Sequence, residues 1–261
     1  MKRYFLIINM IYLVSIPTWL ILQAAGMNFD LEFMWENSPN AFLNSPFLFV
    51  SSAILLIIGI VLLKKYFKNK KDSALLLACY NIIYGFSSFL EGVGNFYAYG
   101  SRYDQVSENL IFILVAWAVV FFFLFLQEIF TGSFAYKDHK LTHKIFLSLL
   151  VAGVILTMMV LPSRDLDIIH QLGVGILAIT LIILSIWQMK AAFHLVKRAD
   201  EPNVKRGLQM IGISGLCLIA VIVLIVLKML VEFVDPLIPI FVFSASIFSY
   251  LGYVQPSKAK K

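Results

Sequence analysis

Apolar runs long enough to cross a lipid bilayer recur along this sequence and limit what it can fold into. The hydrocarbon core of a bilayer requires about 20 consecutive apolar residues of α-helix. Eight runs of about this length are present, at 4–25, 47–63, 74–98, 108–130, 145–162, 167–193, 207–234 and 237–254. The sequence therefore predicts an all-α, polytopic transmembrane helical bundle of about eight spans, with residues 1–261 forming a single transmembrane domain.

The composition supports a membrane protein and argues against a nucleic-acid-binding protein. Hydrophobic residues make up 61% of the chain and charged residues 14%, whereas soluble domains carry about 45–50% and about 25%. The net charge of +6 is distributed over short loops, whereas a nucleic-acid footprint needs basic residues gathered on one soluble face. The lipid bilayer is therefore the expected partner, and no nucleic acid is.

Turn signals and charged residues separate the apolar runs. They occupy 37–39, 45–46, 64–72, 99–101, 131–132, 162–163, 200–202 and 235–236, where Pro, Gly, Ser, Asn or charged residues gather. If the N-terminus is inside, all of the 21 basic residues except Arg102, Arg164 and Lys228 fall on the cytoplasmic side. The positive-inside rule thus predicts a multi-pass protein of the cell membrane with cytoplasmic N- and C-termini.

The first apolar run has an alternative interpretation as a secretory signal peptide, because Met1, Lys2 and Arg3 precede it. Its apolar length of 22 residues exceeds the roughly 7–15 residues of a signal-peptide core. Removal of this run would leave seven spans and an outside N-terminus. Both alternatives stay open at the level of the sequence.

Five polar side chains of the third run lie three or four residues apart and therefore share one helical face. We call this set the polar stripe, and its members are Asn81, Tyr84, Ser88, Glu91 and Asn95. Polar and ionisable groups are costly in lipid, so the polar stripe should face protein. It serves either to hold the bundle together by hydrogen bonds or to bind a ligand or ion. Gly85 and Gly92, beside it, would let a neighbouring helix approach closely.

Further polar residues are expected at the same outer level as Glu91. They are His170 and Gln171 at the start of the sixth run, and Lys228 and Glu232 near the end of the seventh. Together with the polar stripe they form the predicted ligand-binding set, in an outward-facing pocket. The alternatives are that Lys228 snorkels to the interface and pairs with Glu232, and that His170 caps its helix.

No catalytic residue, metal site or cofactor is predicted from a motif. Gly212-Ile213-Ser214-Gly215 matches the Gly-x-Ser-Gly of intramembrane serine proteases, but the sequence places no histidine base at its depth. We interpret this tetrapeptide as a small-residue packing face.

The last span ends in Leu251-Gly252-Tyr253-Val254-Gln255-Pro256. This stretch resembles the exit helix of the multi-span sensor regions that precede archaeal and bacterial histidine kinases, where Leu-Gly-aromatic-x-x-Pro leads into the cytoplasm. The resemblance covers about twenty residues, and no kinase module follows before Lys261. It implies a stand-alone sensor-like domain that signals through a cytoplasmic or membrane partner.

The leading hypothesis is a non-enzymatic, receptor-like or sensor-like bundle that binds a small-molecule or lipidic ligand from its outer side. One alternative is a small-molecule transporter, which would favour polar groups at mid-membrane and repeated halves. The other is a membrane-embedded enzyme acting on lipid, for which Glu128, His139, His143 and His194 are the available residues. Their spacing matches no catalytic motif that we recognise.

Overall fold

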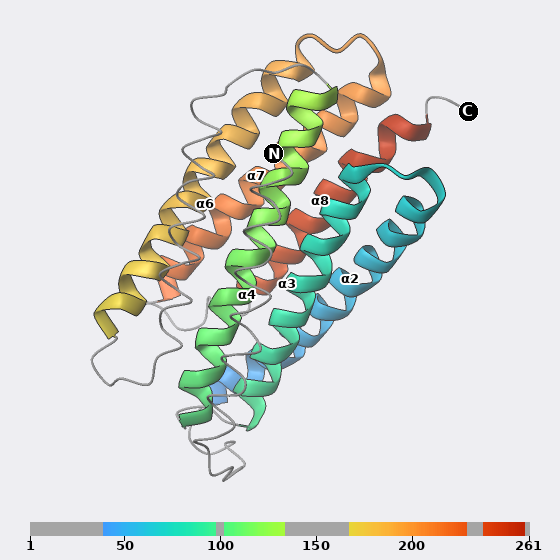
Figure 1. Ribbon diagram of the computed structural model, residues 1–261. Coiled ribbons are helices and arrows are strands. Elements are labelled where there is room, and N and C mark those ends of the chain that lie inside the picture. Colours follow the sequence, from blue (N-terminus) through green and yellow to red (C-terminus); the bar gives the residue numbers. More distant parts are fainter. Residues whose placement is uncertain (1–38, 98–101, 134–166, 229–236, 259–261) are drawn as a thin grey trace.

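The structure is a computed structural model of the 261-residue chain that describes residues 39–97, 102–133, 167–228 and 237–258 (Figure 1). These residues form α2 (Pro39–Asn69), α3 (Asp72–Tyr97), α4 (Arg102–Gln127), the π-helical turn η1 (Glu128–Ser133), α6 (Asp167–Val196), α7 (Pro202–Lys228) and α8 (Leu237–Lys258). Six of the helices are long and apolar enough to cross a membrane. The described part of the chain is thus all-helical, as expected, and the protein is an integral membrane protein. The predicted spans 4–25 and 145–162 lie outside the described residues.

Two of the expected turns are wrong, because helices continue through them. Ser45 and Pro46 lie within α2, although proline lacks a backbone N–H. Transmembrane helices tolerate proline where neighbouring groups satisfy the freed carbonyl. The expected turn at 131–132 lies in η1, where the Thr131 hydroxyl donates to the Gln127 carbonyl at 2.6 Å. The lysine-rich stretch 64–72 is also largely helical, and only Lys70 and Lys71 separate α2 from α3.

The helices pack in a closed circuit. α2 lies along α3, α3 along α4, α6 along α7 and α7 along α8, while contacts of α4 with α6 and of α8 with α2 join the two groups. The α2–α3 turn, the α6–α7 connection and the C-terminal end of α8 lie at the same end of the bundle (Figure 1). The described basic loops are therefore gathered at one end, which we call the basic end, as the charge pattern requires.

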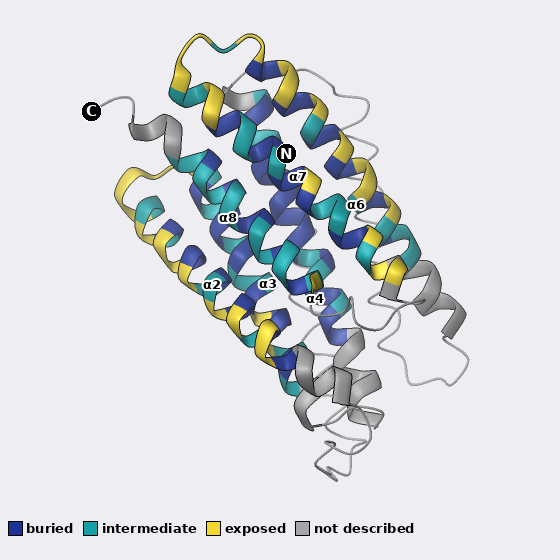
Figure 2. Ribbon diagram, turned by 180° about the vertical axis from the view of Figure 1, so that it is seen from behind, coloured by how far each residue is buried: buried dark blue, intermediate teal, exposed yellow. Residues whose placement is uncertain are grey.

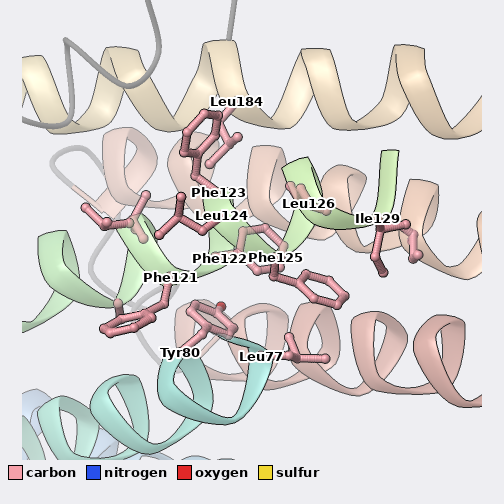
Figure 3. Packing of buried hydrophobic residues seen from close by; sticks show 14 of the residues in the cluster. Leu77, Tyr80, Phe121, Phe122, Phe123, Leu124, Phe125, Leu126, Ile129 and Leu184 are labelled. Atoms are coloured by element: carbon pink, nitrogen blue, oxygen red, sulfur yellow. The ribbon is translucent and has the colours of Figure 1, made fainter. Parts of the chain in front are cut away.

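α4 lies in the interior of the bundle. Every residue from 118 to 126 is buried (Figure 2). Its phenylalanines contact different neighbours: the Phe122 ring centroid lies 4.8 Å from that of Tyr80 on α3, and the Phe123 centroid 6.2 Å from that of Trp187 on α6. These side chains form the centre of the hydrophobic cluster in Figure 3. A helix that is apolar all round is typically buried, which explains this position.

Glycines set the closest helix contacts. The expected approach at Gly85 and Gly92 is confirmed, since a Cβ added there would lie 3.1 Å from Leu55 and 3.0 Å from the Phe49 ring of α2. The tightest approach to a backbone atom joins α7 and α8, where a Cβ on Gly252 would lie 2.6 Å from the backbone oxygen of Gly207. A backbone atom cannot move aside as a flexible side chain can, so Gly252 determines how closely α8 approaches α7.

Replacing Gly252 with alanine should therefore force α8 away from α7 and lower the free energy of unfolding by about 1–3 kcal/mol, the usual cost of overpacking. Thermal unfolding in detergent measures this. Gly175→Ala in α6 is the matched control, because nothing lies within 4 Å of a Cβ placed there. The control should be neutral or more stable, since alanine favours helix over glycine. Equal stability of the two variants would contradict the packing described.

Candidate functional site

In α3, the polar stripe of Asn81, Tyr84, Ser88, Glu91 and Asn95 is from here on the α3 stripe, and its members Asn81, Tyr84 and Ser88 face the interior of the bundle, as the sequence predicts. Asn81 is 0% exposed and Ser88 is 3% exposed, while Tyr84 is partly buried and packs against the hydrophobic cluster. The exposed aromatic residues of α3, Phe86 and Phe89, lie on a different part of its surface. The glycines beside the stripe contact α2, whereas Tyr80 contacts α4. The stripe therefore lies between the α2 contact and the α4 contact.

Asn81 of the stripe has a buried side-chain oxygen, Oδ1, without a hydrogen-bond partner among the described residues. Its Nδ2 donates to the Leu77 carbonyl at 2.7 Å, one helical turn away. A buried acceptor without a partner costs about 1–3 kcal/mol. Such a group is commonly satisfied by water or a ligand in the functional protein, so Oδ1 marks a place where a hydrogen-bond donor can bind.

Two aromatic residues, Tyr80 and Tyr84, stand on either side of Asn81 along α3. The ring centroid of Tyr80 is 5.9 Å from that of Tyr84, one turn further along α3, and Phe122 of α4 closes the group from the other side. Figure 3 shows Tyr80 directed towards the phenylalanines of α4. The arrangement combines an apolar aromatic surface with one unused polar atom, a combination typical of small-molecule sites.

The stripe extends away from the basic end. At a rise of about 1.5 Å per residue, Asn81 lies about 13 Å along α3 from Asp72 and Glu91 about 28 Å. Asn81 is therefore near the middle of a bilayer, and Glu91, which is partly buried, is near the opposite surface. Asn95 lies in the last turns of α3, and its side chain is outside the described part of the structure.

The remaining predicted site residues are described only in part. His170 and Gln171 belong to the first turns of α6, and Lys228 is the last residue of α7. Both helix ends lie away from the basic end (Figure 1). The three side chains are outside the described part of the structure, as is Glu232 altogether. Convergence of these residues on one pocket thus stays a prediction.

A second polar cluster, which the sequence did not predict, joins α6, α7 and α8. Gln188 Nε2 donates to the Ile211 carbonyl at 2.7 Å and to Ser214 Oγ. The Ser214 hydroxyl donates to Ile211 O at 2.8 Å, and the Ser249 hydroxyl donates to Ser214 Oγ at 3.0 Å. Gln188, Ser214 and Ser249 are all 0% exposed. We call these three residues the polar lock, because hydrogen bonds within it hold three helices together.

The surroundings of Ser214 explain the Gly-x-Ser-Gly tetrapeptide. A Cβ on Gly212 would lie 3.0 Å from the Phe193 ring, and one on Gly215 would lie 2.9 Å from Met189 and 3.4 Å from Gln188. Both contacts are with α6, so the expected small-residue packing face is confirmed. The glycines also make room for the Gln188 side chain to reach Ser214. A glutamine in the middle of an apolar run was the signal in the sequence that could have revealed the lock.

No protein-family model, no curated protein and no solved structure shows significant similarity to this chain. The candidate site therefore rests on its own geometry.

Replacing Gln188 with leucine removes both interhelical hydrogen bonds that its side-chain amide nitrogen, Nε2, donates. Interhelical hydrogen bonds in membranes average about 0.6 kcal/mol, so the variant should lose about 1 kcal/mol of stability. Thr180→Val is the matched control, since Thr180 is also buried in α6 but donates to the Ile176 carbonyl of its own helix at 2.7 Å. Reversible unfolding in mixed micelles measures both. A loss no greater for Gln188→Leu than for Thr180→Val would show that the lock does not tie the helices together.

Proposed function

We propose that this integral membrane protein is a receptor-like or sensor-like helical bundle that binds a small or lipidic ligand against the α3 stripe. The observation that carries the proposal is the buried Oδ1 of Asn81, which lacks a partner among the described residues. The ligand enters from the side opposite the basic end, where Glu91 lies. Its hydrogen-bond donor reaches Asn81, and its apolar part rests on Tyr84 and the rings beside it.

Contacts from the stripe to the basic end support a signalling role. Tyr80 packs on Phe122 of α4, and Phe125, nearly one turn later, meets Tyr253 of α8 with ring centroids 6.0 Å apart. The Lys65 ammonium of α2 lies 4.4 Å from the centre of the Tyr253 ring. A ligand that shifts Tyr84 or Tyr80 can therefore change how α8 meets α2. Tyr253 belongs to the stretch that resembles the exit helix of histidine-kinase sensor regions, and a partner at this end would receive the signal.

A small-molecule transporter is the second candidate, and one observation favours it. Transport sites lie near the bilayer midplane. At about 1.5 Å per residue, Asn81 and Ser214 both lie about 13–18 Å from the basic end, close to that plane. Both hydroxyl groups of the polar lock, however, already donate hydrogen bonds, Ser214 to the Ile211 carbonyl and Ser249 to Ser214 Oγ. We therefore favour the sensor.

Ligand binding is tested by native mass spectrometry of the gently solubilised protein beside Asn81→Leu and Glu91→Gln. Asn81→Leu removes the acceptor, so a co-purifying small molecule should be retained at least ten-fold less, about 1.4 kcal/mol. Thr180→Val serves as the control, because its hydroxyl is satisfied within α6. Melting temperatures measured alongside separate lost binding from misfolding. If all well-folded variants retain the molecule equally, the α3 stripe is not the binding site. Movement of a small molecule into liposomes that contain the protein would favour the transporter.

The orientation is part of the same proposal: the basic end faces the cytoplasm, in the cell membrane, with cytoplasmic termini. Lys68 is exposed at the basic end and Leu237 is exposed at the opposite end. Cysteine substituted for Leu237 should react with a membrane-impermeant maleimide in intact cells. Cysteine substituted for Lys68 should react only after permeabilisation, because the positive-inside rule places it in the cytoplasm. The reverse labelling pattern would show that the basic end faces outward.

A further inference from the structure

The connection between α2 and α3 has a defined backbone conformation. Lys70 has a positive φ of 52°, the left-handed region that few residues other than glycine adopt. Its N–H donates to the Tyr66 carbonyl at 2.6 Å, which ends α2 as a left-handed cap, and the Ala74 N–H donates to Lys71 O at 3.0 Å. Only Lys70 and Lys71 link the two helices. The basic residues here are therefore held on a short, ordered turn.

This turn is strongly positive. Residues 64–72, which we call the lysine turn, contain five lysines and a single acidic residue, Asp72. Four of the lysines are exposed, namely Lys64, Lys68, Lys70 and Lys71. The α6–α7 connection at the same end is more balanced, since Lys197, Arg198, Lys205 and Arg206 are accompanied by Asp200 and Glu201. Positive charge is thus more concentrated at the α2–α3 turn than at the α6–α7 connection.

An exposed aromatic side chain lies among these lysines. Phe67 is 66% exposed, and the ammonium of Lys70 lies 5.3 Å from the centre of its ring. Lys70 is also 5.4 Å from the ring of Tyr66. An exposed phenylalanine is unfavourable in water, whereas apolar side chains beside lysines are favourable in the headgroup region of a membrane. The lysine turn thus presents charge and apolar surface together.

We propose that the lysine turn docks anionic phospholipid headgroups, with Lys64, Lys68 and Lys71 contacting their phosphates and Phe67 entering the adjoining acyl region. Charge complementarity favours an anionic partner, and the exposed Phe67 favours one with an apolar portion. α2 itself crosses the bilayer, so headgroups are always present at its end. Free phosphate would leave Phe67 in water. The proposal is independent of the α3 stripe and of the orientation of the bundle.

The test uses the full chain in nanodiscs that contain equal amounts of phosphatidylglycerol and phosphatidylcholine. After release into mild detergent, native mass spectrometry measures the ratio of the two lipids retained by the protein. Each basic residue near an anionic surface contributes about 1 kcal/mol, which corresponds to about five-fold in binding. The triple variant Lys64→Gln, Lys68→Gln and Lys71→Gln should therefore lose the preference for phosphatidylglycerol, with a drop of at least five-fold. Both leaflets carry the same lipids, so the result does not depend on topology.

The control removes the same number of charges elsewhere at the basic end, by Lys197→Gln, Arg198→Gln and Lys205→Gln. Its loss of preference should be clearly smaller than that of the first triple variant, because Asp200 and Glu201 already offset the positive charge of this connection. Equal losses in the two triple variants, or no loss in the first, would overturn the proposal. Sodium phosphate should displace the lipid no better than sodium chloride of equal ionic strength. A stronger effect of phosphate would indicate a site for the free anion instead.

Discussion

The arrangement of the helices depends on the aromatic run of α4. Within a bilayer the hydrophobic effect does not drive helices together, because lipid is as apolar as their side chains, so close packing has to hold them. Phe122, Phe123 and Phe125 point to different sides of one helix and meet Tyr80, Trp187 and Tyr253 on α3, α6 and α8. α4 thus sets the rotation of three neighbours at once. Glycines between α2 and α3 and between α7 and α8 then determine how closely the remaining helices approach.

These rotations place the polar residues. Because Tyr80 faces α4 and Gly85 faces α2, the residues between them on the helical surface, Asn81, Tyr84 and Ser88, point into the bundle. On α6, Trp187 packs against Phe123, and the next residue, about 100° further round the helix, is Gln188. Gln188 therefore faces α7 and reaches Ser214. Both polar regions follow from the same apolar contacts with α4.

Apolar length and helical period were sufficient to predict the six described spans and the inward face of the α3 stripe. They underestimated the length of the helices at their charged ends, because the helical backbone continues past the apolar run, as from Lys64 to Asn69 in α2. Pro46 was misread as a turn, because transmembrane helices tolerate a proline that the rules for soluble proteins place outside a helix. Gln188 signals a buried polar contact in the sequence, but its partners could not be predicted, because the meeting of Gln188, Ser214 and Ser249 depends on the relative depth and rotation of three helices.

The two polar regions differ in what their hydrogen bonds leave available. In the polar lock the Ser214 hydroxyl donates to Ile211 O and accepts from Gln188 and Ser249, so it has no capacity left for a ligand. Gln188 keeps one buried oxygen without a partner in the described residues, but Gly215 of α7 packs directly on its side chain. The hydrogen bond of Asn81 Nδ2 is to the Leu77 carbonyl of its own helix. Asn81 Oδ1 can therefore accept a hydrogen bond while the contacts between helices stay intact. The lock is therefore suited to holding helices together, whereas Asn81 Oδ1 can accept a hydrogen bond without loss of a tertiary hydrogen bond of Asn81.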